Sequence, residues 1–117
     1  MAEITVDGST FDAEDGIRLV LALEANGVDI LHRCGGYAGC TTCRVEFTDG
    51  EPSTMTQAEK DKLAERELTG EVRLSCQILC SGSMTVTPVM TVSSSAFDEP
   101  GPTPETGITP DPVWVDA

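Results

Sequence analysis

The cysteines are the residues whose type and spacing suit a chemical role, because thiolates bind metals and carry redox chemistry. Three of the five form a C-x5-C-x2-C pattern at Cys34, Cys40 and Cys43, and Cys76 follows after a long interval. The gap after Cys34 holds three glycines, which can adopt positive φ and let backbone amides approach inorganic sulfide. Three thiolates from one loop and one from a distant segment can enclose a two-iron cluster, so the pattern favours a [2Fe–2S] site.

Other metal sites fit these residues less well. Structural zinc sites usually pair two tight knuckles, and only Cys40 and Cys43 have that spacing. A Rieske centre needs two histidine ligands, whereas His32 is the only histidine and is expected to flank the cluster rather than bind it. The fifth cysteine, Cys80, is interpreted as a buried, inert thiol; its alternative role is that of a ligand in place of Cys76.

These residues resemble a [2Fe–2S] ferredoxin of the β-grasp fold. The first gap of five residues is similar to the adrenodoxin-like branch, since the plant-type branch has a gap of four. Segments 55–59 (MTQAE) and 73–77 (RLSCQ) also resemble the family, and the resemblance covers roughly residues 1–90. It implies an α+β fold, the ubiquitin-like roll, with a glycine-rich loop around the cluster. By motif position, the ligands that it implies are Cys34, Cys40, Cys43 and Cys76.

The function implied by this resemblance is that of a one-electron carrier between a reductase and an acceptor enzyme. The sequence shows no acid–base constellation and no nucleotide-binding loop, so we expect an electron-transfer protein, not an enzyme, with no catalytic residues. A second class is a redox-sensing or cluster-sensing interaction protein, in which an acidic tail ending near Trp114 would bind a fixed partner.

The charge of the chain indicates which partners it can meet. Its 20 acidic and 7 basic residues give a formal net charge of −13, which repels nucleic acid and anionic membranes and attracts basic protein surfaces. We expect a monomer that docks on basic redox partners. The expected acidic contributors lie on or just after the second predicted helix: Glu59, Asp61, Glu65 and Glu67. The alternative contributors are the tail residues Asp98, Glu99 and Glu105.

The predicted elements alternate between short strands and two helices. A β-hairpin is expected around the turn signal at residues 7–8. A helix over 17–25 follows, with Ile17, Val20 and Leu21 on its buried face and Leu23 as a further candidate for it. Residues 28–43 are expected to form a glycine-rich loop. A strand over 44–47 precedes a capping-box pattern that opens a charged helix over 57–65, and two short strands follow at 72–74 and 84–89.

The composition changes after residue 92. Five of the seven prolines lie between Pro100 and Pro112, and neither Lys nor Arg occurs beyond Arg73. We therefore divide the chain into a ferredoxin-type domain, 1–92, and an extended acidic tail, 93–117. The apolar tail end, Val113-Trp114-Val115, is expected to dock on the body or on a partner. Clustered cysteines and the lack of a visible secretory signal or membrane span predict a soluble, cytoplasmic protein.

Overall fold

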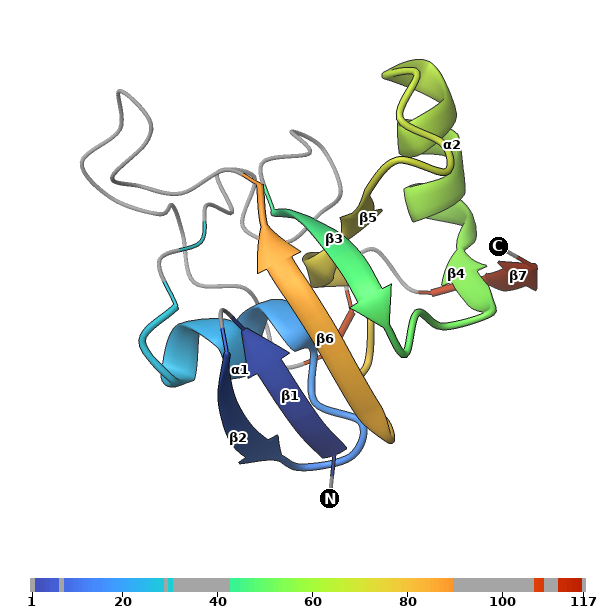
Figure 1. The fold of residues 1–117 in the computed structure, drawn as a ribbon. Coiled ribbons are helices and arrows are strands. Elements are labelled where there is room, and N and C mark those ends of the chain that lie inside the picture. The colour runs from blue at the N-terminus through green and yellow to red at the C-terminus, as the bar shows by residue number, and fades with distance from the viewer. Residues whose placement is uncertain are drawn as a thin grey trace.

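A five-stranded mixed sheet forms the body of the protein in a computed structural model, which describes residues 2–6, 8–28, 30, 43–89, 107–108 and 112–116 (Figure 1). The strand order is β2-β1-β6-β3-β5. The strands are β1 (Ala2–Val6), β2 (Ser9–Ala13), β3 (Arg44–Asp49), β5 (Arg73–Leu74) and β6 (Ser83–Pro88). β1 and β6 are parallel, and the pairs β1–β2, β3–β6 and β3–β5 are antiparallel.

The N-terminal hairpin is confirmed. Ala2 pairs with Ala13 and Val6 pairs with Ser9, and the alternation of the sequence places Ile4 and Val6 in the core. Helix α1 (Leu19–Ala25) then crosses behind β1 (Figure 1).

The start and the buried face of α1 differ from the prediction. Ile17 and Leu21 are only half-buried, and the buried positions are Leu19, Val20, Ala22 and Leu23. The helix begins two residues later than expected because Arg18 has extended φ and ψ angles and forms a β-bridge with Leu79. Val20 belongs to both faces and Ile17 and Leu21 still pack against the core, so the buried face is turned from the predicted one by roughly a third of a turn.

The second helix, α2 (Gln57–Glu65), follows its predicted bounds. The Thr56 hydroxyl caps it by accepting a hydrogen bond from the Glu59 amide at 3.1 Å. A short strand precedes the helix, β4 (Thr54–Thr56), and it pairs antiparallel with β7 (Trp114–Asp116) near the C-terminus (Figure 1). The apolar tail end thus docks on the body, which is one of the two outcomes expected.

The core is mainly aliphatic, since aromatic residues make up only 4% of the sequence. Its largest fully buried apolar side chains include Ile4, Leu19, Leu23, Ile30, Leu63, Leu74, Ile78 and Met84. Among the described residues, no helix is both long and apolar enough to cross a membrane.

Candidate metal centre

Two of the four predicted ligands, Cys43 and Cys76, lie in the described part of the chain. Cys43 immediately precedes β3, and Cys76 lies in the 3-10 helix η1 (Ser75–Gln77) that follows β5. Both side chains are buried. Cys34 and Cys40 fall within residues 31–42, outside the described residues, as do His32 and the loop glycines.

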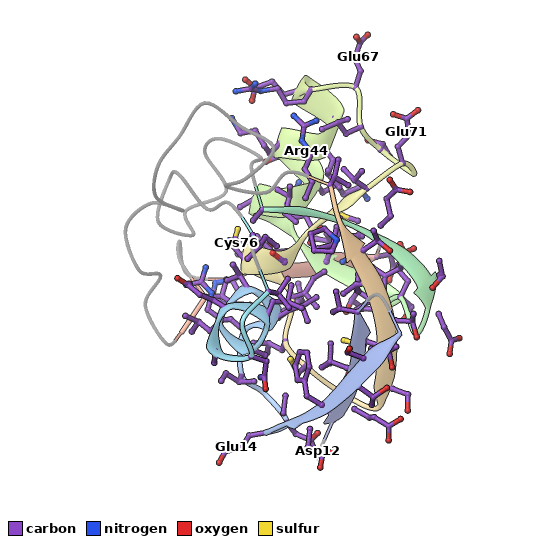
Figure 2. The ribbon with its side chains drawn as sticks, turned by 60° about the vertical axis from the view of Figure 1, so that its left-hand side comes forward. Asp12, Glu14, Arg44, Glu67, Glu71 and Cys76 are labelled. Atoms are coloured by element: carbon purple, nitrogen blue, oxygen red, sulfur yellow. The ribbon has the colours of Figure 1, made fainter. Side chains whose placement is uncertain are left out.

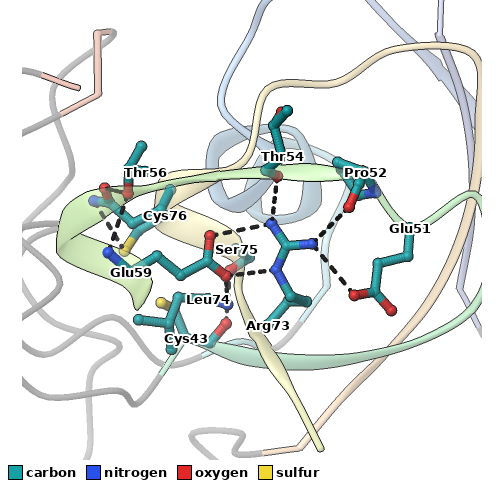
Figure 3. Close-up of polar contacts among 11 residues, drawn as sticks. Cys43, Glu51, Pro52, Thr54, Thr56, Glu59, Arg73, Leu74, Ser75 and Cys76 are labelled. Carbon is teal, nitrogen blue, oxygen red and sulfur yellow. Dashed lines mark hydrogen bonds and ion pairs between the residues drawn. The ribbon is translucent and has the colours of Figure 1, made fainter. Parts of the chain in front are cut away.

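The pairing of β3 with β5 brings the two described cysteines to the same end of the sheet. The strands are antiparallel, and Arg44, the first residue of β3, pairs with Leu74, the last residue of β5. The next residue, Ser75, donates to the Cys43 carbonyl oxygen from its amide at 3.1 Å and from its hydroxyl at 2.8 Å (Figure 3). Strand pairing and the hydrogen bonds of Ser75 therefore hold Cys43 close to Cys76, 33 positions away in the sequence. Cys76 lies between α1 and α2, as Figure 2 shows.

A side-chain amide lies beside the Cys76 sulfur. Gln77 Nε2 donates to Cys76 Sγ at 3.7 Å, and Gln77 Oε1 accepts a hydrogen bond from the Thr56 hydroxyl at 2.7 Å. The same hydroxyl caps α2. The cap of the helix therefore orients an N–H donor toward a thiol, and such donors stabilise the thiolate form and tune a bound metal.

A buried ion pair anchors α2 to the segment that carries Cys76. Arg73 Nε donates to Glu59 Oε2 at 2.7 Å, and the Leu74 amide donates to the same oxygen at 2.9 Å (Figure 3). Arg73 also donates to the carbonyl oxygens of Pro52 and Thr54, both at 3.0 Å. Burial raises the pKa of the Glu59 carboxyl, and the hydrogen bonds from Arg73 and Leu74 oppose that rise. The pair fixes the position of β5 and therefore of η1.

Glu59 corrects two expectations from the sequence. Its carboxylate accepts from Arg73 and Leu74 rather than returning to the helix start, so only half of the capping box forms. The side chain is also completely buried, so it cannot belong to an acidic docking surface. No local sequence signal indicates this contact, because Arg73 is 14 positions from Glu59 and its burial depends on the tertiary structure.

Cys80 is buried in a different hydrogen-bonded segment. Its amide donates to the Ile17 carbonyl oxygen at 2.8 Å, and its own carbonyl oxygen accepts from the Gly16 amide at 3.0 Å. Burial, with a smaller contribution from the negative charge of Asp15, raises the pKa of the Cys80 thiol to about 11. The thiol is therefore protonated at neutral pH, which agrees with its interpretation as an inert buried group.

The described donors fit an iron–sulfur cluster. Cys43, Cys76 and Cys80 form no disulfide bonds, and iron–sulfur clusters are held by cysteine thiolates. The hydrogen bond from Gln77 to Cys76 Sγ is of the kind that tunes such a cluster. Within the described ranges no group of three metal-ligating side chains gathers, and two of the predicted ligands lie beyond those ranges. The fold and this pair of cysteines are typical of an iron–sulfur protein of the ferredoxin type.

Comparison with known proteins supports that class. The family model for the 2Fe-2S iron-sulfur cluster binding domain matches residues 4–81. Terpredoxin from Pseudomonas sp is 38% identical over 79 residues, which are 62% of this chain and 74% of that protein. Putidaredoxin from Pseudomonas putida is 40% identical over 75 residues, which are 58% of this chain and 69% of that protein. The structure also resembles a chain of the covalent putidaredoxin reductase–putidaredoxin complex, with a TM-score of 0.57 and 32% identity over 74% of this chain and 97% of that one.

The chain therefore belongs to the family of 2Fe-2S ferredoxin domains, in the group that includes putidaredoxin and terpredoxin. It has the β-grasp fold of these proteins and binds a [2Fe–2S] cluster. Its function is electron transfer rather than enzyme catalysis.

Proposed function

We propose that Cys34, Cys40, Cys43 and Cys76 bind the cluster and that the chain carries single electrons from a reductase to an acceptor enzyme. The observation that carries the ligand assignment is the Ser75 bridge to the Cys43 carbonyl oxygen, which places the Cys43 and Cys76 segments side by side. Cys80 is not a ligand in this proposal, because its backbone is hydrogen-bonded to Gly16 and Ile17, away from the bridge between Cys43 and Ser75. Once bound, the cluster supplies a reversible one-electron couple.

The side chains around the two described cysteines prepare them for that role. Ser75 joins the segments of Cys43 and Cys76 by a hydrogen bond, and the Gln77 amide donates a hydrogen bond to the Cys76 sulfur. Arg73 and Glu59 keep the supporting backbone rigid, which limits reorganisation when the charge of the site changes. These residues also exclude water, since Ser75, Cys76 and Gln77 are all buried.

The reductase partner is inferred from the solved complex of putidaredoxin with its reductase. We infer that the partners present basic surfaces, because the chain has a formal net charge of −13. Exposed carboxylates project from opposite ends of the molecule, Glu67 and Glu71 at one end and Asp12 and Glu14 at the other (Figure 2). The end that contains Glu67 and Glu71 adjoins α2 and is our proposed docking surface.

Three further proposals concern the domain division, the oligomeric state and the location of the chain. We propose that residues 1–92 form the electron-transfer domain and that 93–117 form a tail whose end is fastened to it through β7. We further propose a monomer, and a cytoplasmic location in which clustered cysteines serve as metal ligands.

Serine substitutions test the ligand assignment. Cys34→Ser, Cys40→Ser, Cys43→Ser and Cys76→Ser should each impair cluster assembly, measured as iron and sulfide content and as the visible spectrum. Cys80→Ser, the matched control, should retain about two irons and two sulfides per chain. Loss of the cluster in Cys80→Ser together with its retention in Cys76→Ser would overturn the assignment.

Salt dependence tests the carrier role and its docking surface. Electron transfer from a reductase with a basic docking face should slow steeply as ionic strength rises, because screening shortens to about 8 Å near physiological salt. The double variant Glu67→Gln/Glu71→Gln should reproduce the slowing at low salt, whereas Asp12→Asn/Glu14→Gln should not. A cluster that no reductase can reduce would favour the sensing role, and rates that are flat with salt would refute electrostatic docking.

A further inference from the structure

Arg18 occupies a position for which arginine is a poor choice. It is the N-cap residue of α1, where Ser, Thr, Asp and Asn are preferred because their side-chain oxygens accept hydrogen bonds from the first helical amides. Arginine carries only donors, and Arg18 makes no side-chain capping bond. Its side chain is nevertheless completely buried, which is rare for arginine. The residue therefore serves something other than the helix.

The Arg18 guanidinium joins two distant parts of the chain. Its Nε and Nη2 donate to the Cys76 carbonyl oxygen at 2.9 and 2.7 Å. Its Nη1 donates to the Gly107 carbonyl oxygen at 3.0 Å. The backbone beside it is held as well, since the Leu19 amide donates to the Ile78 carbonyl oxygen at 2.8 Å. One buried cation thus contacts both a proposed ligand residue and the C-terminal segment.

We propose that Arg18 is a positioning residue that sets the reduction potential of the cluster and makes that potential depend on the docked C-terminal segment. The proposal rests on the proposed role of Cys76 as a ligand. Because Arg18 contacts the Cys76 backbone rather than its sulfur, it acts through the position of that residue and through its own charge.

The sign of the effect follows from electrostatics. Reduction adds one negative charge to the cluster and its thiolates, and a buried cation nearby stabilises that charge more strongly than an exposed one. Two donors on the Cys76 carbonyl oxygen also draw electron density away from the ligand residue. Arg18 therefore raises the potential, and the Gly107 carbonyl oxygen helps to hold the guanidinium in place.

The neighbouring residue Ile108 gives a way to disturb this contact in the full-length chain. Ile108 is only 7% exposed, so the segment that carries Gly107 is docked through an apolar side chain. Ile108→Asp should expel the segment, because a carboxylate cannot be buried there without a partner. Val113→Asp is the matched control, since Val113 is 63% exposed and lies in the same tail.

Reduction potentials of the cluster-loaded variants test the proposal. Arg18→Gln should shift the reduction equilibrium at least tenfold toward the oxidised form, which is 59 mV for a one-electron couple. Arg18→Lys, which keeps the charge but not the forked geometry, should shift it less and in the same direction. Arg66→Gln removes an exposed cation and should leave the potential near that of the wild type.

The coupling between the tail and the reduction potential is tested with the double variant Arg18→Gln/Ile108→Asp. Ile108→Asp should lower the potential in the wild-type background but add little in the Arg18→Gln background, while Val113→Asp should change neither. Equal shifts in Arg18→Gln and Arg66→Gln, or an Ile108→Asp shift that is the same in both backgrounds, would overturn the proposal. If Arg18→Gln assembles no cluster, the reduction potentials of Arg18→Lys and Ile108→Asp serve as the test. The proposal would be overturned if both variants had the wild-type potential. A wild-type chain without the [2Fe–2S] visible and EPR spectra would instead overturn the proposed function.

Discussion

Replacing Arg73 with Gln removes the cation that opposes the burial of Glu59. In the wild-type protein, Arg73 donates two hydrogen bonds to the carboxylate and one each to the Pro52 and Thr54 carbonyl oxygens. Glutamine cannot reach these acceptors together and carries no charge. The completely buried Glu59 carboxylate then keeps only the Leu74 amide as a donor among the described contacts.

The cost of this change is estimated from the buried pair. Removing one partner of a buried, hydrogen-bonded ion pair costs about 3–5 kcal/mol, because the other charge is left uncompensated. We take about 4 kcal/mol for Arg73→Gln. An unfolding entropy of about 2.1 cal/mol/K per residue, applied to 117 residues, converts this to a fall in Tm of about 16 °C.

The deficit should also depend on pH, and its sign can be worked out. Burial already raises the pKa of Glu59 in the folded wild-type protein, and loss of Arg73 raises it further. The folded state then retains a proton that the unfolded state has already lost. The stability that this proton confers is complete below the unfolded pKa and is lost as pH rises through the folded pKa. Arg73→Gln should therefore lose more stability at neutral pH than near pH 5.

Thermal unfolding followed by circular dichroism and by the visible absorbance measures both effects. Midpoints should be compared at one scan rate, because the midpoint of an irreversible transition depends on that rate. Arg66→Gln is the control, since it removes an exposed arginine just after α2 and should leave Tm unchanged. An Arg73→Gln midpoint within about 4 °C of the wild type, or a deficit that is constant with pH, would refute the role assigned to the pair.

Three further outcomes follow from the structure. Gly50 and Gly70 both have positive φ, but a Cβ at Gly50 would overlap a carbonyl oxygen of β6, whereas a Cβ at Gly70 would meet open space. In denaturant unfolding, Gly50→Ala should therefore lose about 1–3 kcal/mol more stability than Gly70→Ala. Cys80, with a pKa of about 11, should react with iodoacetamide at pH 8 on the order of a hundredfold more slowly in the folded than in the unfolded protein, and fast labelling of the folded form would contradict this. Thr56→Val should lower stability by about 1 kcal/mol through the lost cap, and it should make the reduction potential more negative because Gln77 loses its orienting partner; an unchanged potential would remove Gln77 from the argument.

Local patterns predicted much of the fold. The N-terminal hairpin, β3 and the bounds of α2 depend on alternation, turn residues and a capping hydroxyl, which act between residues close in sequence. The predicted start of α1 was wrong because of a tertiary contact. Arg18 pairs with Leu79, 61 positions along the chain, and that bridge keeps it extended where the apolar pattern suggested helix.

Non-local pairing also explains the elements that were missed. β4 and β7 have three residues each, so neither carries enough alternation to be recognised. They form because the tail returns to β4, where the Gln57 amide donates to the Val113 carbonyl oxygen at 2.7 Å. A proline-rich composition does not reveal such a contact.

The sequence by itself determined the chemistry of this protein, because the number, type and spacing of its cysteines limit which metal group they can hold. It also determined the acidic character of the surface. Only the tertiary structure decided which charged residues are buried rather than exposed on that surface. Glu59 is paired with Arg73, and Arg18 donates to the Cys76 and Gly107 carbonyl oxygens. The physical reason is that a charged side chain is buried only where partners from other segments satisfy it, and strand pairing brings those partners together.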